Sequence, residues 1–330
     1  MKAMLKSWSV LIVAMLMALS LIACGSAEDA APNSAPSETP AQQEKPAEQP
    51  AEEQGALKTQ YPLTVKDATG TEVTFEKAPT RIVSLAPSET EKLFALGLDE
   101  EIVGVSDLDD YPEAAKSKPK MGGFQVNEEA VIAAEADVVF SASMNAENAE
   151  KLRGMGVKLF VNDPSTIEEV MSSITLVGQI TDRQEEAQTV VEQMRQELAS
   201  VTEAVKSVKE EDKKKVYVEF SPGWTVGSGT FLDELVTLAG GVNIMNDREG
   251  WFEVDPEAVI ARNPQVIIHP RIEGVDFAGD MLSRPGWDRI DAVRNNRVVA
   301  VANEPLVRVG PRLTDGLLEI AAALHPERFP

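Results

Sequence analysis

The sequence predicts an α/β protein with two similar lobes, one long helix that joins them and a ligand crevice between them. Three observations predict this architecture. The pentapeptide EAVIA occurs at 129–133 and again at 257–261, and the match continues around both copies at a constant offset. Similar apolar strands accompany the two copies in the same order. A helical segment at 182–208, free of Gly and Pro, separates them.

The N-terminal segment has the features of a secretion signal followed by a tether. Lys2 and Lys6 precede an apolar run that ends at Ile22 and is too short to span a membrane comfortably. We therefore expect a signal peptide at 1–23. The run ends in LIAC, which is similar to the bacterial lipobox, so Cys24 is expected to carry the lipid anchor. A signal peptide cleaved elsewhere, or a short uncleaved anchor, is the alternative.

Residues 24–56 are expected to form the lipidated cysteine and the tether that follows it. From 25 to 56 there is no Val, Ile, Leu, Met or aromatic residue, so nothing can offset the entropy of ordering and we expect disorder. The mature protein is therefore expected outside the cytoplasm, held to the cell membrane by its lipid.

Composition excludes several classes of partner and site. The formal charge of −23, from 54 acidic and 31 basic residues, disfavours nucleic acid and anionic membrane surfaces. A single cysteine excludes an intramolecular disulfide and a cysteine zinc site. With only His269 and His325, binding of free zinc or manganese is disfavoured as well. We expect neither a resident metal nor a cofactor.

The N-terminal lobe is expected at 57–178. Alternating residues on both sides of DATG predict a hairpin within 61–79. An apolar strand follows at 82–85, and Ser88 with Glu91 has the spacing of a capping box that opens a helix. Further strands are expected at VVF (138–140) and within 157–164.

The second lobe is expected to repeat this order after the joining helix. That helix is predicted from the apolar periodicity at 182–208, and we assign the whole inter-lobe segment to 179–210. The C-terminal lobe then covers 211–330, with strands predicted at 216–220, at 266–268 and within 296–305. In open α/β sheets ligands bind beyond the carboxyl ends of the strands, so the crevice is expected there.

Each EAVIA is predicted to open a short helix. Asn127 and Asp255 are the expected N-caps, which places Glu129 and Glu257 at the second helical position. A carboxylate in the first turn stabilises a helix through its dipole, and on the residues alone this is the leading explanation of both glutamates.

Several segments, taken in their order and spacing, are similar to those of a known protein family. RIVSLAPSETEKLFALGLDEEIVGVSDLDDYP, FLDELVTLAGGVNI, VDPEAVIARNPQVII and GPRLTDGLLEIAAALHPERF together resemble the helical-backbone substrate-binding proteins of bacterial ATP-driven importers, over 61–329. The likeness is strongest to cobalamin-binding members, and relatives carry ferric siderophores or haem. It implies a monomer that serves a permease dimer with its ATPase. It also implies that Glu129 and Glu257 dock onto that permease.

The resemblance also implies where a metal chelate binds. A corrinoid such as cobalamin leads, with a ferric siderophore or haem as the alternative. Leu108 departs from the cobalamin binders, in which this position is often aromatic. The acids of the SDLDDYP loop favour a neutral or amide-rich chelate. Whether His269 or Met121 serves as an axial metal ligand stays open. The expected ligand-binding residues are Trp251, Trp224, Phe124, Tyr111, Phe252, His269 and Arg308.

An enzyme is disfavoured because the sequence carries no catalytic motif. It has no nucleophile elbow, HExxH, Walker loop or dinucleotide fingerprint. Ser221 or Ser228 with His269 and an acid gives a triad on paper only, so a secreted serine hydrolase is a distant alternative.

Overall fold

The computed structural model describes residues 57–143 and 146–329, which belong to one compact unit of the chain. The predicted signal peptide, the lipidated Cys24 and the tether lie outside the described residues. Among the helices that are described, none combines the length and apolarity needed to cross a membrane.

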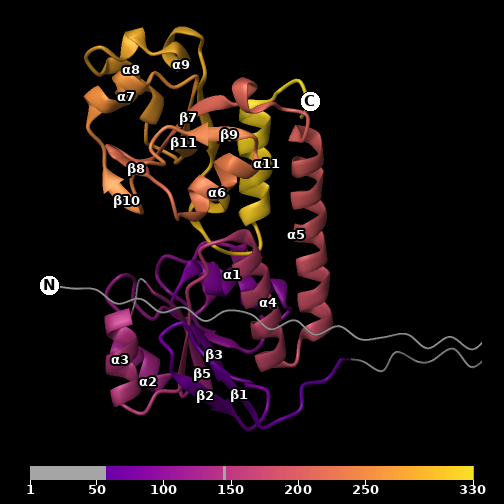
Figure 1. Ribbon diagram of the computed structural model, residues 1–330. Coiled ribbons are helices and arrows are strands. Elements are labelled where there is room, and N and C mark those ends of the chain that lie inside the picture. The colour runs from indigo at the N-terminus through magenta and orange to yellow at the C-terminus, as the bar shows by residue number, and fades with distance from the viewer. Residues whose placement is uncertain (1–56, 144–145, 330) are drawn as a thin grey trace, which may run out of the picture. The chain divides into compact units, whose positions relative to one another are not determined.

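The N-terminal lobe contains a hairpin and a small parallel sheet (Figure 1). The predicted hairpin is confirmed, since the first two strands pair antiparallel. Four parallel strands follow in the order β4-β3-β5-β6. The strands are β1 (Leu63–Lys66), β2 (Glu72–Phe75), β3 (Ile82–Ser84), β4 (Ile102–Gly104), β5 (Val138–Ala142) and β6 (Leu159–Asn162). The helices are α1 (Pro87–Ala95), η1 (Glu113–Ser117), α2 (Glu128–Ala133), α3 (Ala146–Gly154) and α4 (Ile167–Thr181).

The C-terminal lobe has a parallel sheet of the same design with two strands added. Its parallel strands run in the order β9-β7-β11-β12, and β8 and β10 extend the sheet antiparallel. The strands are β7 (Lys214–Ser221), β8 (Trp224–Val226), β9 (Gly241–Asn243), β10 (Trp251–Glu253), β11 (Val266–Arg271) and β12 (Val298–Ala302). The helices are η3 (Glu210–Asp212), α6 (Phe231–Leu238), α7 (Pro256–Arg262), α8 (Phe277–Ser283), η4 (Trp287–Arg289), α9 (Asp291–Arg294), α10 (Asn303–Val307) and α11 (Leu313–Leu324).

The repeat predicted from EAVIA is a repeat of structure. The order β4-β3-β5-β6 corresponds strand for strand to β9-β7-β11-β12. Equivalent residues also make equivalent bonds. Asp137 accepts a hydrogen bond from the backbone N–H of Arg81, just before β3, and Gln265 accepts one from the N–H of Lys215 in β7. The two lobes are therefore two copies of one α/β unit.

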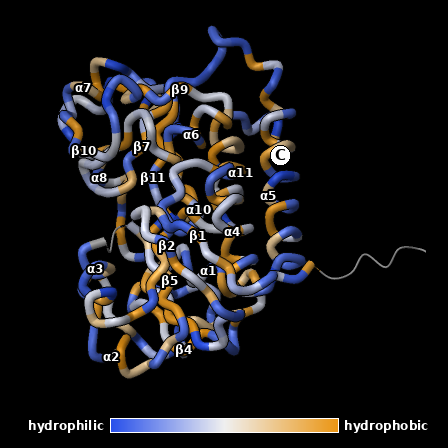
Figure 2. The backbone as a smooth tube through the Cα atoms, turned by 60° about the horizontal axis from the view of Figure 1, so that its bottom comes forward, coloured by the Kyte–Doolittle hydropathy of each residue, from blue (hydrophilic) through white to orange (hydrophobic). Residues whose placement is uncertain are grey.

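The joining helix α5 (Gln184–Val205) is shorter than predicted at both ends. Asp182 ends α4 in the left-handed conformation, with φ of 57°, so the segment before Gln184 belongs to a separate helix. The expected lobe boundary at 178 consequently falls inside α4. Helix α5 packs against α4 of one lobe and α11 of the other (Figure 1). Its tube alternates between hydrophobic and hydrophilic stretches in Figure 2, as an amphipathic helix requires.

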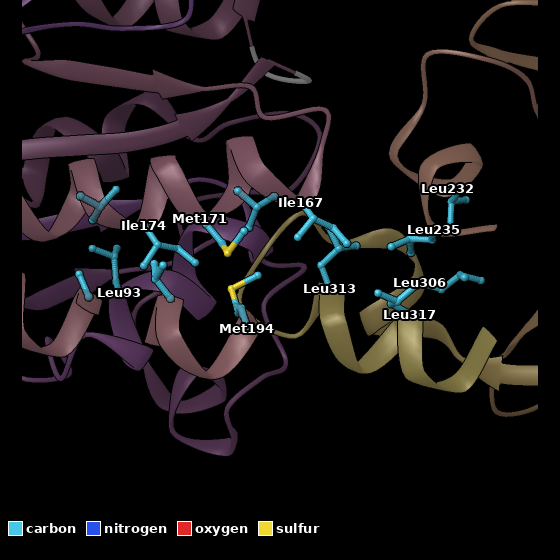
Figure 3. Close-up of a cluster of buried hydrophobic side chains, with 14 of the residues drawn as sticks. Leu93, Ile167, Met171, Ile174, Met194, Leu232, Leu235, Leu306, Leu313 and Leu317 are labelled. Atoms are coloured by element: carbon cyan, nitrogen blue, oxygen red, sulfur yellow. The ribbon is translucent and has the colours of Figure 1, made fainter. Parts of the chain in front are cut away.

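The two lobes share one apolar core along their helical side. Leu93 of α1, Met171 of α4 and Met194 of α5 lie in the same buried cluster as Leu235 and Leu313 of the C-terminal lobe (Figure 3). Two further clusters lie within single lobes. Spreading the lobes at the shared core would expose this apolar surface to water, which costs about 25 cal/mol of free energy for each Å² exposed. The lobes are therefore fused on this side.

One local prediction is wrong. The expected capping box at Ser88 and Glu91 does not form, because α1 begins at Pro87 after Ala86, which makes no side-chain cap. Proline fits the first helical position, and Glu91 instead binds two arginines of the other lobe. The strand predicted within 296–305 is confirmed as β12, and α10 begins directly after it at Asn303.

Candidate functional site

A crevice of about 640 Å³ opens between the two lobes. The N-terminal lobe contributes the segments that follow β3, β5 and β6, which agrees with the expected position beyond the carboxyl ends of the strands. The C-terminal lobe contributes the start of α6, one residue of β10 and the segment around α10. Its size is typical of a small-molecule site.

The C-terminal wall of the crevice is apolar. Trp251 lines it with 43% of its surface exposed, and its ring packs against Phe220 and Phe231 at centroid distances of 4.8 and 5.4 Å. Val307 and Val309 line the same side. Aromatic rings held by other rings lose little entropy when a ligand covers them, so this wall suits a large, flat apolar surface.

The N-terminal wall has a polar part, beside the apolar Leu108 and Phe124, and this polar part rests on a buried ion pair. Glu89 is 1% exposed and accepts a hydrogen bond of 2.7 Å from Lys92, which is fully buried. Its other oxygen accepts from the side-chain amide of Asn162. Glu89 also lies in the first turn of α1, whose N-terminus borders the crevice, so its charge offsets the helix dipole as well.

Asp163 and Ser143 complete the polar wall. Both are exposed, and the Ser143 hydroxyl donates to the Asp163 carboxylate. Within the described residues Asp163 has no ion-pair partner, whereas the other two charged side chains of the crevice, Glu89 and Arg308, are both paired. Asp163 is therefore the uncompensated charge of the lining.

A network of charges connects the lobes behind the crevice, and we call it the interlobe clasp. Glu91 of α1, 2% exposed, binds Arg308 at 3.0 Å and Arg312 at 2.6 Å. Asp110 binds Arg308 at 2.8 Å, and the Arg312 guanidinium stacks 3.7 Å from the Tyr111 ring centroid. Burial alone would lower the pKa of Arg308, but its hydrogen bonds to Asp110 and Glu91 outweigh burial and raise the pKa. Arg308 thus lines the crevice as a charge already neutralised.

Asp109 lies next to the clasp in an unusual environment for a carboxylate. Its Oδ2 accepts hydrogen bonds from Thr90 and from the N–H of Ser106. Its Oδ1 is buried without a hydrogen-bond partner among the described residues. Burial outweighs these hydrogen bonds and raises the pKa of Asp109 to about 6.

Three of the seven predicted ligand-binding residues line the crevice. Phe124 and Trp251 stand at it with 72% and 43% of their surface exposed, and Arg308 lines it while held in the clasp. Leu108, the departure from the cobalamin pattern, lines it too and is 37% exposed.

The other four lie elsewhere. Phe252 is 7% exposed in the core of the C-terminal lobe, since strand alternation turns it away from the side that Trp251 faces. Trp224 is exposed on β8 outside the crevice lining, and Tyr111 stacks on Arg312 in the clasp. His269 is buried, stacked on Phe277 and hydrogen-bonded to the Pro270 carbonyl.

The positions of His269, Met121, Ser221 and Ser228 support neither an axial metal ligand nor a catalytic Ser-His-acid triad. Met121 is 4% exposed in the core of the N-terminal lobe, so neither it nor His269 reaches the crevice. Among the described residues, no hydrogen bond joins His269 to Ser221 or to Ser228. The Ser228 hydroxyl instead donates a hydrogen bond to the Arg248 carbonyl. Residues 57–143 and 146–329 contain no cluster of three or more His, Cys, Asp or Glu side chains that could hold a metal ion.

The two repeated glutamates occupy equivalent exposed positions. Asn127 caps α2 and Asp255 caps α7, as predicted, so Glu129 and Glu257 are second in their helices. Both side chains are exposed, and neither has a hydrogen bond or ion pair to any residue that the structure describes. The neighbouring Glu128, by contrast, pairs with Lys151.

Several lining residues were not predicted. Asn162 and Asp163 follow β6 directly, and the rule that ligands bind beyond strand ends could have found them in the VNDP segment. Phe231 opens α6, where its apolar character indicated only a helix core. The pairing of Arg308 with Glu91 has no local signal, because 217 residues separate them.

Comparisons with known proteins give one family. The family model for periplasmic binding proteins matches residues 82–305. An uncharacterized ABC transporter substrate-binding lipoprotein of Bacillus subtilis is 35% identical over 277 residues, covering 82% of this chain and 87% of the relative. A cobalamin-binding protein of Halobacterium salinarum is 27% identical over 280 residues, covering 80% and 74%.

The fold has solved counterparts as well. A crystal structure of a possible iron-binding, periplasmic solute-binding protein from Staphylococcus epidermidis matches with a TM-score of 0.64 and 32% identity, over 76% of this chain and 100% of that one. The expectation of a binding protein rather than an enzyme is confirmed by the family match. With more than half of the chain matched by the family model, and a relative matched over most of both lengths, this chain belongs to the periplasmic binding protein family, among the two-lobed substrate-binding components of ABC importers.

Proposed function

We propose that this protein captures a metal chelate in the crevice between its lobes and delivers it to the permease of an importer. A corrinoid is the leading ligand. The observation that carries this choice is the pairing of an aromatic wall at Trp251 with polar groups opposite, among whose described residues there is no free cation. A corrinoid has a broad apolar ring with an amide periphery, which matches both walls. The cobalamin-binding relative from Halobacterium supports the same choice.

A ferric siderophore is the second candidate. Leu108 stands where an aromatic residue is often found in cobalamin binders, and the similar Staphylococcus protein is described as iron-binding. Haem is less well supported, because the candidate axial ligands His269 and Met121 are buried away from the crevice.

Fluorescence titration of the purified chain with cyanocobalamin tests the ligand. Trp251 and Trp224 provide a matched pair, since they are 43% and 44% exposed on antiparallel strands but only Trp251 lines the crevice. We expect saturable quenching that Trp251→Leu abolishes and Trp224→Leu preserves. A flat titration with cyanocobalamin, followed by saturation with a ferric siderophore, would move the assignment to the second candidate. No response to any chelate would refute the proposed function.

We further propose that Glu129 and Glu257 dock the loaded protein onto a two-fold permease that works with its ATPase. Their equivalent, exposed and unpaired positions support this role. Glu168 provides a control, because it is also an exposed carboxylate at the second position of a helix, α4.

Charge reversal separates docking from dipole stabilisation. We expect Glu129→Lys with Glu257→Lys to abolish uptake in cells that carry the cognate importer while the ligand dissociation constant is unchanged. Glu168→Lys should cost a similar ~0.3–1 kcal/mol of helix stability per site yet leave uptake intact. Normal uptake by the double variant, or an equal loss in the control, would contradict docking.

We also propose that the lipid on Cys24 holds the protein at the outer side of the cell membrane. The lipoprotein description of the Bacillus relative supports this. Cys24→Ser is expected to prevent incorporation of radiolabelled palmitate and to release the protein into the soluble extracytoplasmic fraction. A labelled, membrane-bound Cys24→Ser variant would refute the anchor.

A further inference from the structure

The charged side chains that line the crevice differ in how far neighbouring charges neutralise them, and this difference affects which ligands can bind. Glu89 is neutralised by Lys92 and hydrogen-bonded by Asn162. Arg308 is held by two carboxylates of the opposite lobe, so it has little attraction left for an anionic ligand. Among the described residues Asp163 has a hydroxyl partner, Ser143, and no ion-pair partner.

We propose that Asp163 is a charge filter: it favours chelates whose edge carries neutral hydrogen-bond donors, such as primary amides, and rejects those whose edge carries ionised carboxylates or catecholates. This inference rests on the proposed chelate-binding function and narrows its substrate class.

The hydrogen-bonding groups of the polar wall fit this assignment. A carboxylate only accepts hydrogen bonds, so Asp163 complements an amide N–H and opposes another carboxylate. The amide nitrogen of Asn162 donates one hydrogen bond to Glu89, and the amide oxygen is a second acceptor on this wall. Ser88 also lines the crevice, and its hydroxyl is able to donate or accept.

The remaining electrostatics act in the same direction. Trp251 and Phe231 on the opposite wall offer no charge that could compensate a ligand carboxylate. The formal net charge of −23 adds a long-range potential of the same sign as Asp163.

Two ligands that share one ring system but differ at the edge test the filter. Dicyanocobinamide carries amides, whereas dicyanocobyrinic acid carries carboxylates at the corresponding positions. We expect the full-length protein to bind the amide form at least about tenfold more tightly at low salt, a difference of ~1.4 kcal/mol. Asp163→Asn keeps the shape and an acceptor for Ser143, and should reduce the ratio to about threefold or less, mainly by tightening the acid.

The controls separate charge at the crevice from charge in general. Glu113→Gln makes the same charge change at an 85%-exposed side chain that does not line the crevice, and should leave the ratio unchanged. Raising the salt concentration should shrink the wild-type ratio because Asp163 is exposed. Equal affinities in the wild type, or an unchanged ratio in Asp163→Asn, would overturn the filter.

The outcome also distinguishes this inference from the proposed function. If neither corrinoid binds, the same comparison is made between haem and its dimethyl ester. Tighter binding of haem itself would overturn the charge filter while leaving chelate capture intact, whereas tighter binding of the ester would support it. If none of these probes nor a ferric siderophore binds, the proposed function fails together with the inference.

Discussion

Removal of the Glu91 carboxylate tests the interlobe clasp directly. In Glu91→Gln, Arg308 keeps Asp110, whereas Arg312 loses the one carboxylate that binds it among the described residues and keeps its stacking on Tyr111. The side chains of Glu91, Arg308 and Arg312 are 2%, 13% and 21% exposed, so the Arg312 guanidinium, left without its carboxylate partner, cannot be fully hydrated in place. Removing one partner of a buried ion pair costs ~3–5 kcal/mol, and the partial exposure places this variant near 3.

The assay is unfolding of the purified chain by guanidinium, followed by circular dichroism, with thermal unfolding as a second measure. For a folded region larger than 200 residues, a loss of about 3 kcal/mol lowers Tm by roughly 6–12 °C. Glu113→Gln is the control, because its pair with Lys116 is 85% and 52% exposed and such exposed pairs contribute little to stability. If Glu91→Gln and Glu113→Gln destabilise the protein equally, the clasp does not hold the lobes as argued.

Two further predictions concern buried groups. Phe252→Ala should destabilise the protein by ~3–5 kcal/mol because it empties part of the C-terminal core, whereas Trp224→Ala, 44% exposed outside the crevice, should cost less than about 1; similar losses in denaturant unfolding would refute this placement. Burial raises the pKa of Asp109 from 3.8 to about 6, while Thr90, Ser106, Lys120 and Arg308 oppose the rise. The folded state therefore holds a proton that the unfolded state releases, so this contribution to stability is complete below about pH 4 and is lost as the pH rises past 6. Relative to Asp109→Asn, the wild type should lose up to about 3 kcal/mol of unfolding free energy between pH 4 and 7; parallel pH curves for the two proteins would contradict the assignment.

Local patterns predicted much of the fold. The repeated EAVIA, with Asn127 and Asp255 before it, predicted both helix starts because an N-cap bonds within its own first turn. Strand positions followed from short apolar runs, and the crevice position followed from the general rule for strand ends. Errors occurred where a nonlocal partner competed. Glu91 has the spacing of a capping residue, yet α1 begins one residue too early for Ser88 to be its N-cap, and Glu91 binds two arginines more than 200 residues away.

The sequence by itself determined the two-lobed repeat, the joining helix and the family, because periodicity, capping and segment order are encoded over short distances. Only the tertiary structure decided which side chains face the crevice. It turned Phe252 inward and His269 into the core, neutralised Arg308 across the lobes and left Asp163 uncompensated. The physical reason is that burial and charge pairing depend on residues brought together by folding, and composition alone cannot state which opposite charges will meet.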